Sequence, residues 1–241
     1  PPRSTLFPYT TLFRSMIDAL TIQAVQKVSD AGYPDDAGAV LLIELEGLQD
    51  EVDEIGEEVE AALWETGATQ VRTAEAAAER EQLWVGRKGA LGALGSIAPN
   101  YFLVDGVVPR TQLAPVLGRV AEVSRKYNIP IANVFHAGDG NLHPCLLFDE
   151  RQPGALDKIV EAGTEVLRIC VDAGGTLTGE HGVGLEKKEQ MPLVFSAEDM
   201  AAMVLVRDAF APDNSLNPGK IFPDGKKPKP HAHPPAHGMP A

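Results

Sequence analysis

Apolar and polar positions alternate with two different periods along this chain, and the alternation predicts strands and helices in turn. The run at 38–47 is apolar, rich in strand-forming residues and closed by glycine, which is typical of a strand. The acidic segment 50–66 has its apolar residues at helical spacing and ends at Gly67, so it predicts an amphipathic helix. The same approach predicts strands over 69–74, 101–109, 129–137 and 141–149, helices over 74–95, 111–127, 153–173 and 197–210, and a strand or extended loop over 175–182.

The strands at 129–137 and 141–149 are joined by a short Gly- and Asn-containing turn, so they predict a β-hairpin. A hairpin is antiparallel, which favours an α+β fold over a purely parallel sheet. The sequence contains no glycine pattern of the kind that cradles a dinucleotide or a nucleoside triphosphate. We therefore expect an α+β fold, with a largely antiparallel sheet and helices packed on one face.

Composition narrows the classes of partner. The 241 residues carry a net charge of -13, which argues against nucleic acid, because phosphate binding needs a basic surface. No apolar run reaches the roughly 18 residues that a membrane span requires. The two cysteines, Cys145 and Cys170, form no CxxC pair, so we interpret them as reduced thiols of a cytoplasmic protein.

The two ends of the chain differ from its middle. Residues 1–15 repeat Thr-Leu-Phe and look like translated adapter sequence, so we interpret them as a non-native leader outside the fold. Residues 225–241 are rich in proline and histidine and are expected to be a disordered tail, a solvated segment rather than a metal site. The expected domain is therefore 16–224.

Two histidines bracket the turn of the predicted hairpin. His136 ends the first strand, His143 lies near the start of the second, and the turn 138–141 has residues that tolerate positive φ. Cross-strand neighbours lie about 5 Å apart at Cβ, a separation that allows two imidazole nitrogens to bind one metal ion. The alternative is a structural turn whose histidines make ordinary hydrogen bonds.

A third ligand could come from the glycine-rich segment 174–188. Glu180 and His181 are adjacent there, and adjacent residues of an extended segment point to opposite sides. One of them could bind a metal while the other faces a substrate, and the glycines would let the backbone approach a ligand closely. On residue chemistry alone, a metal site and a pair of structural turns both remain open.

Three motifs in order and spacing resemble the C-terminal domain of FAD-linked 2-hydroxy-acid oxidases and dehydrogenases. They are "HAGDGNLHP" (136–144), "TGEHGVGLEKK" (178–188) and "NPGKIFP" (217–223). "LVDGVVPR" (103–110) and "LWVGRKGA" (83–90) are similar to the branch with the glycolate oxidase flavin subunit and the D-lactate dehydrogenases. The resemblance covers about 16–223 and implies a ferredoxin-like cap over a flavin domain.

The resemblance also implies an activity and a set of roles. Such enzymes oxidise a 2-hydroxy acid to the 2-oxo acid by passing a hydride to FAD. By this resemblance a divalent metal, expected to be zinc, is held by His136, His143 and Glu180, and His181 is the catalytic base. Arg87 is implied to bind the substrate carboxylate, although without the resemblance it would be interpreted as a solvated helix charge. Positions implied to lie near the flavin are Asn141, Asn217 and Lys220.

The sequence departs from the family pattern in two respects. No FAD-binding domain precedes the resemblance, so we expect a fragment without the flavin cradle. Leu103 stands where some relatives carry a lysine that contacts a longer diacid, which favours glycolate or D-lactate. Other subunits of a glycolate oxidase-type complex are expected partners, in the cytoplasm or peripheral to the inner membrane.

Two alternatives to a working oxidoreductase domain remain. The first is a catalytically incompetent module that binds metal or carboxylates and needs a separate flavin-binding chain. The second is a metallohydrolase in which the metal alone activates water, but no additional acid/base pair is evident for it.

Overall fold

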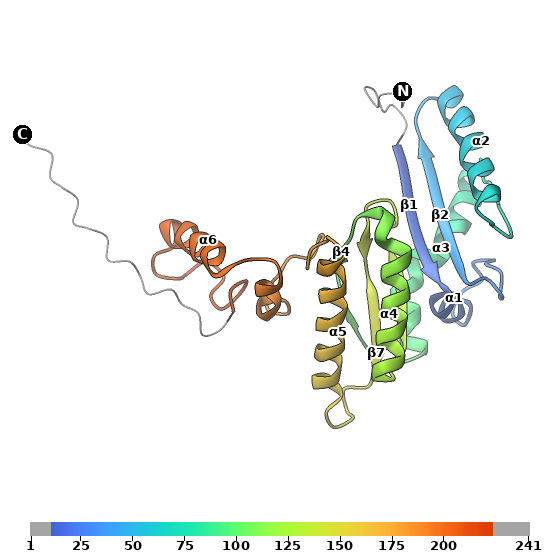
Figure 1. Cartoon of the computed structure of the whole chain (residues 1–241). Coiled ribbons are helices and arrows are strands. Elements are labelled where there is room, and N and C mark those ends of the chain that lie inside the picture. Colours follow the sequence, from blue (N-terminus) through green and yellow to red (C-terminus); the bar gives the residue numbers. More distant parts are fainter. Residues whose placement is uncertain (1–10, 224–241) are drawn as a thin grey trace, which may run out of the picture. The chain divides into compact units, whose positions relative to one another are not determined.

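The computed structural model of the chain describes residues 11–223 (Figure 1). They divide into two compact units, the first ending at Glu180 and the second beginning at His181. The expected disordered tail at 225–241 and most of the expected leader lie outside the described residues. Within the described part of the chain, no helix is both long enough and apolar enough to cross a membrane.

Antiparallel strands form the centre of the first unit. The strands are β1 (Thr11–Asp18), β2 (Ala39–Glu46), β3 (Asn100–Leu103), β4 (Gly106–Val107), β5 (Ile131–Phe135), β6 (Asn141–Leu142) and β7 (Pro144–Phe148). Five of them form one sheet in the order β2-β1-β5-β7-β3, and β4 pairs with β6 in a second, smaller sheet. Every neighbouring pair in both sheets is antiparallel. The expected α+β class with a largely antiparallel sheet is confirmed.

Two helices cover one face of this sheet. α4 (Leu113–Tyr127), which follows a short 3₁₀ helix (Arg110–Gln112), connects β3 to β5, and β7 lies between those two strands. This is the split β-α-β arrangement of ferredoxin-like folds. α5 (Ala155–Asp172) follows β7 and packs against α4, as Figure 1 shows. The close approach of α5 to the sheet depends on Gly163, because a Cβ there would lie 2.8 Å from the Phe102 ring.

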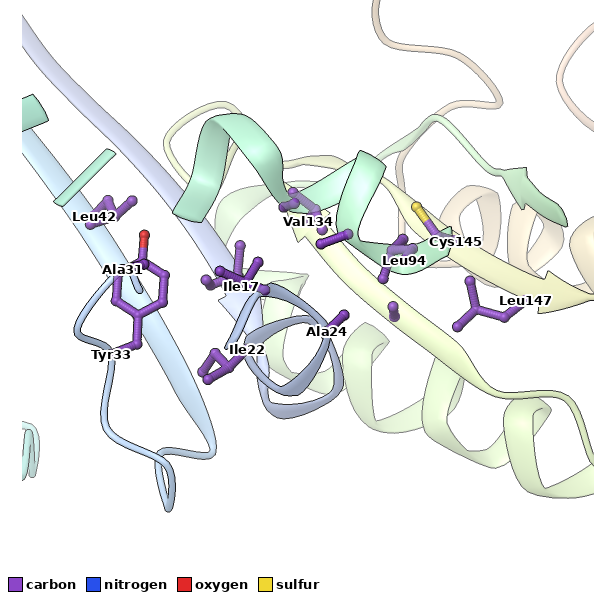
Figure 2. Packing of buried hydrophobic residues seen from close by; sticks show 14 residues of the cluster. Ile17, Ile22, Ala24, Ala31, Tyr33, Leu42, Leu94, Val134, Cys145 and Leu147 are labelled. Carbon is purple, nitrogen blue, oxygen red and sulfur yellow. The ribbon is translucent and has the colours of Figure 1, made fainter. Parts of the chain in front are cut away.

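The opposite face of the sheet is covered as well, which was not expected. α1 (Ala19–Gln26) and α3 (Ala77–Ala93), with a short 3₁₀ helix (Leu94–Ser96), bury their apolar residues there. Figure 2 shows Ile22 and Ala24 of α1 in the cluster that also holds Val134, Cys145 and Leu147 of the sheet. Successive strand residues point to opposite faces, so Leu146, which is also fully buried, faces α4 and α5. A sheet buried on both faces explains why β5 and β7 are apolar at nearly every position.

The structure corrects two of the expected strands. The segment 69–74 has no regular structure, and its only aliphatic side chain larger than alanine is Val71. The side chain of Arg72 donates to the carbonyl of Gly32 at 2.7 Å. The strand expected over 101–109 is divided into β3 and β4, because Asp105 lies between them and its carboxylate binds a distant loop. The expected acidic helix is present as α2 (Gln49–Glu65).

The fold also begins earlier than expected. β1 starts at Thr11 and lies between β2 and β5, so the sheet includes residues 11–15 of the segment that we excluded. Ser15 is fully buried, and its hydroxyl donates to the carbonyl of Phe135 at 3.0 Å. The non-native origin of residues 1–15 stays a prediction.

The second unit is built around one helix. α6 (Ala197–Phe210) begins with a capping box in which the Ser196 side chain accepts from the Asp199 amide and the Asp199 carboxylate accepts from the Ser196 amide. The expected start of the last helix is therefore confirmed. A 3₁₀ helix (Lys188–Leu193) precedes it, and the amide of Ile221 donates to the carbonyl of Gly184 at 2.8 Å, which joins the two ends of the described part of this unit.

Candidate metal and substrate site

The turn between β5 and β7 is fixed by its own backbone and by a neighbouring segment. The amide of His136 donates to the carbonyl of Asn141 at 3.1 Å, which closes the hairpin. Gly140 has φ +74°, and its carbonyl accepts from the amide of Val108 at 2.9 Å. A Cβ at Gly140 would lie 2.1 Å from the carbonyl oxygen of Val108, so only glycine fits this position.

The hairpin brings the two imidazoles together, as the sequence predicted. The ring centroids of His136 and His143 are 5.4 Å apart, with the rings nearly perpendicular. His143 is buried, and a quarter of the His136 side chain is exposed. His136 lies two residues after Val134, and His143 lies two residues before Cys145. Val134 and Cys145 both face α1 and α3, so the two histidines lie on the same face, at the edge of the sheet.

Glu180 reaches the same point from the loop after α5. Its Oε1 atom lies 3.0 Å from Nε2 of His143 and 3.7 Å from Nε2 of His136, and the three possible ligand atoms lie within 4.8 Å of one another. Ligands about 2 Å from a tetrahedral ion are ~3.3 Å apart, so the observed spacing fits one small divalent cation. Two imidazoles and a carboxylate are also a donor set of catalytic zinc sites that leaves a coordination position open. The role of the three residues as ligands stays a prediction.

Asp105 belongs to this cluster and was not predicted from the sequence. The residue is fully buried, and its Oδ1 atom lies 3.6 Å from Nε2 of His143. Its carboxylate accepts from the Thr178 hydroxyl at 2.7 Å and from the amides of Gly179 at 3.1 Å and Glu180 at 3.3 Å. One acidic residue inside the otherwise apolar run 102–108 was the signal that could have identified it.

Asn141 contacts the same loop. A Cβ at Gly179 would lie 2.7 Å from the amide group of Asn141, so the absence of a side chain at Gly179 lets the loop lie directly on this amide. Asn141 is buried and lies beside the hairpin turn. The structure therefore places Asn141 with His136, His143 and Glu180, and its expected role near a flavin stays a prediction.

The side chain of Arg87, on α3, is partly buried and hydrogen-bonded, so it is not a fully solvated charge on the helix surface. Its Nε donates to the hydroxyl of Ser15, which in turn donates to the carbonyl of Phe135, directly before His136. The preceding Gly86 lets α3 pack tightly, because a Cβ there would lie 2.3 Å from the Tyr33 ring. Burial lowers the pKa of Arg87, and the negative charges that Tyr33, Cys145 and Glu180 carry when ionised oppose that shift.

The protonation of His136 suits a metal ligand. Burial lowers the pKa of His136 below 6.5, the charge of Glu180 raises it, and Arg87 and His143 lower it further. A neutral imidazole has a nitrogen lone pair that can bind a cation, whereas the protonated form has none. At neutral pH, His136 is therefore in the form that a metal requires.

The remaining predicted site residues belong to the second unit. His181 is its first residue. Asn217 has φ +46°, and its side-chain oxygen accepts from Nζ of Lys220 at 3.2 Å. The structure thus joins Asn217 to Lys220, and the roles of these two residues and of His181 stay predictions.

Known proteins resemble this chain over most of its length. The family described as FAD linked oxidases, C-terminal domain, matches residues 12–221. The glycolate oxidase subunit GlcD of Escherichia coli (strain K12) is 46% identical over 208 residues, which cover 86% of this chain and 42% of that protein. GlcD of Bacillus subtilis (strain 168) is 36% identical over 86% of this chain and 44% of its own length. The chain therefore spans less than half of these relatives.

More distant relatives share the fold. The mitochondrial D-lactate dehydrogenase [cytochrome] of Arabidopsis thaliana is 30% identical over 62% of this chain and 27% of its own length. Among solved structures, the 4-ethylphenol oxidase of Gulosibacter chungangensis superposes with a TM-score of 0.60 over 88% of this chain and 48% of the oxidase, at 15% identity. At that identity the similarity shows the fold alone.

Proposed function

Because the chain belongs to the family of FAD-linked oxidase C-terminal domains, we propose that it is the substrate- and metal-binding domain of an oxidoreductase. The reaction is the FAD-dependent oxidation of a small 2-hydroxy acid to the 2-oxo acid. The observation that carries the proposal is the convergence of His136, His143 and Glu180 beside a half-buried Arg87.

His136, His143 and Glu180 would hold a divalent cation, with zinc the expected ion. When bound, such an ion supplies a Lewis acid that lowers the pKa of a coordinated hydroxyl group. The three residues provide one negative charge and two neutral nitrogens, so a bound ion keeps a net positive charge. That charge attracts the carboxylate and hydroxyl oxygens of a 2-hydroxy acid.

Arg87 would bind the carboxylate of the substrate. A guanidinium can donate two parallel hydrogen bonds to a carboxylate, which fixes its orientation as well as binding it. The Nε of Arg87 is already engaged by Ser15, so the terminal nitrogens are the atoms that would face the substrate. His181 would take the hydroxyl proton, because an imidazole is a suitable general base at neutral pH.

A bound FAD would supply the hydride acceptor for this oxidation. In this chain, Asn141, Asn217 and Lys220 are the residues proposed to lie near it. Asn141 is positioned by the hairpin and the Gly179 loop. Lys220 and Asn217 support each other through a side-chain hydrogen bond.

A small monoacid, glycolate or D-lactate, is the proposed substrate. Leu103 pairs with Cys145 across β3 and β7 and faces the same side of the sheet as His143. An apolar side chain at this position offers no positive charge to a second carboxylate. The relatives named above are glycolate oxidase subunits and D-lactate dehydrogenases, which supports the same choice.

The same relatives support a proposal about partners. GlcD is named as a subunit of glycolate oxidase, so we propose that this chain also acts with other subunits. The proposed location is cytoplasmic, or peripheral to the inner membrane. The negative charge of -13 disfavours nucleic acid as a partner.

Metal content of the purified chain tests the proposal. The chain is loaded with zinc, desalted and analysed by mass spectrometry, beside His136→Ala, His143→Ala and Glu180→Gln variants. We expect one zinc ion per chain in the parent and a strong loss in each variant. A control with His231, His233 and His237 all replaced by alanine should retain its zinc.

Ligand binding by the zinc-loaded chain then tests the substrate class. Calorimetry should show tighter binding of glycolate than of acetate, because acetate lacks the hydroxyl that the metal would bind. The metal assignment would be overturned if the parent chain bound no zinc. It would also be overturned if the His136→Ala, His143→Ala and Glu180→Gln variants kept their zinc. Equal affinity for glycolate and acetate would overturn the 2-hydroxy-acid assignment.

A further inference from the structure

Asp105 lies between two parts of the proposed metal site that come from distant segments. One part is the loop 178–180, whose hydroxyl and amide groups donate to the Asp105 carboxylate. The other is His143, whose Nε2 is 3.6 Å from Oδ1 of the same carboxylate. Asp105 thus contacts both the loop that carries Glu180 and the hairpin that carries the histidines.

The hydrogen bonds to Asp105 act on the backbone of Glu180. The amide of Glu180 donates to Oδ1 at 3.3 Å, and the amide of Gly179 lies 3.1 Å from both oxygens. Backbone amides at a carboxylate fix the position of the chain more closely than a long side chain could. The backbone of Glu180 is therefore held in place, and its side chain extends from this position to His143.

The same hydrogen bonds argue that Asp105 is no metal ligand. An ionised carboxylate has about four lone-pair sites, and the loop contacts made by Thr178, Gly179 and Glu180 engage both of its oxygens. Asp105 also lies outside the group of three residues whose ligand atoms are mutually close. Its effect on an ion would come through the loop and through charge.

The burial of Asp105 makes its negative charge costly unless the surroundings compensate for it. The side chain is fully buried, and a buried carboxylate is costly unless hydrogen bonds and an opposite charge compensate for it. Together with Glu180 it places two negative charges beside two imidazoles. A divalent cation held by His136, His143 and Glu180 keeps a net positive charge, and that charge would compensate for the buried Asp105 carboxylate.

We infer that Asp105 is a positioning residue of the metal site, which holds the Glu180 loop against the histidine hairpin and adds a second negative charge. This inference rests on the proposed function, because it needs a cation at His136, His143 and Glu180. Replacing a residue that supports metal ligands in this way typically lowers metal affinity by about 10- to 100-fold.

The test compares zinc affinity in Asp105→Asn and in the parent chain, measured by competition with a chromophoric chelator. The asparagine keeps the size of the side chain and one acceptor oxygen but loses the charge. We expect affinity to fall about 10- to 100-fold while one zinc ion per chain is still bound at saturation. The matched control is Asp149→Asn, which removes an aspartate that pairs with Arg151 at 2.7 Å and should leave affinity unchanged.

A second variant isolates the contact with the loop. Thr178→Val removes the hydroxyl that donates to Asp105 at 2.7 Å and keeps the shape of the side chain. We expect zinc affinity to fall about fivefold, the effect of one hydrogen bond. In the double variant the losses should not add, because both changes disrupt the same contact. The visible spectrum of bound Co²⁺, which reports coordination geometry, should change in Asp105→Asn and not in Asp149→Asn.

The outcomes separate this inference from the proposed function. A parent chain that binds no zinc would overturn both. Stoichiometric zinc in the parent, with an affinity in folded Asp105→Asn within twofold of the parent, would overturn the inference and leave the proposed function standing. If circular dichroism shows that Asp105→Asn is unfolded, Thr178→Val decides, and an unchanged affinity in that variant would overturn the inference.

Discussion

Nε2 of His143 lies 3.0 Å from Oε1 of Glu180, although β7 and α5 separate the two residues along the chain. The contact exists because the hairpin ends and the loop after α5 meet at one edge of the sheet. Gly179 allows the loop to approach the hairpin this closely, since a side chain at Gly179 would collide with Asn141. The proposed chemistry depends on this contact between the hairpin and the loop after α5.

The turn should be intolerant of any side chain at Gly140. Alanine at this position would keep a positive φ and place its Cβ against the carbonyl of Val108. We expect Gly140→Ala to lower the free energy of unfolding by about 2 kcal/mol or more, measured by urea titration. Gly118→Ala is the control, because Gly118 lies within α4 with open space around it, and this change should be neutral or stabilising by up to about 1 kcal/mol. Equal effects of the two changes would contradict the role of the turn.

Arg87 should matter for carboxylate binding, whereas its neighbour should not. In Arg87→Met the guanidinium is lost and much of the apolar stem is kept. We expect the zinc-loaded chain to bind glycolate about tenfold more weakly or worse, since a charge-assisted pair is lost. The measurement is titration calorimetry, with Lys88→Met as the control because Lys88 is exposed. A similar loss in both variants would point to general charge rather than to a specific contact.

The two cysteines should be inert in the folded chain. Burial raises the pKa of Cys145 and that of Cys170 to about 12, so almost no thiolate is present near pH 8. We expect iodoacetamide to modify neither residue in the native protein and both in urea, as read by intact mass. Rapid labelling of either residue without denaturant would show that this part of the core opens readily.

The stability of the metal-free chain should depend on pH through His136. A histidine in the unfolded chain titrates near pH 6.5, and burial keeps the pKa of His136 in the fold below that value. As pH falls below 6.5, His136 takes up a proton in the unfolded chain before it does so in the folded chain. The contribution of neutral His136 to stability is therefore fully present above pH 6.5. It is lost as pH falls toward the pKa of His136 in the folded chain. Urea midpoints with a chelator present should therefore fall more between pH 8 and pH 5.5 in the parent than in His136→Gln. A constant difference between the two proteins would contradict the effect.

The hairpin could be predicted from the sequence because its signals are local. Apolar strands flank a turn whose Gly138, Gly140 and Asn141 tolerate the required backbone, so the two histidines had to approach each other. The approach of Glu180 to them could not be obtained in that way. It depends on how α5 returns the chain to the sheet. The residues alone made the segment 174–188 a possible source of a third ligand, and the resemblance to a known family singled out Glu180.

Other features lacked a sequence signal of sufficient strength. α1 is eight residues long, too short for a clear helical pattern, so the second covered face of the sheet was not expected. Asp105 stands alone in an apolar run, where one acidic residue looks like the exposed side of a strand. Its burial becomes evident only when the loop that donates hydrogen bonds to it is in place.

The metal site is tested most directly by anomalous diffraction from crystals of the zinc-loaded chain, with data collected on both sides of the zinc absorption edge. We expect one strong anomalous peak about 2 Å from Nε2 of His136, Nε2 of His143 and a carboxylate oxygen of Glu180. Zinc found only elsewhere on the chain, with no anomalous peak at these three residues, would contradict this expectation.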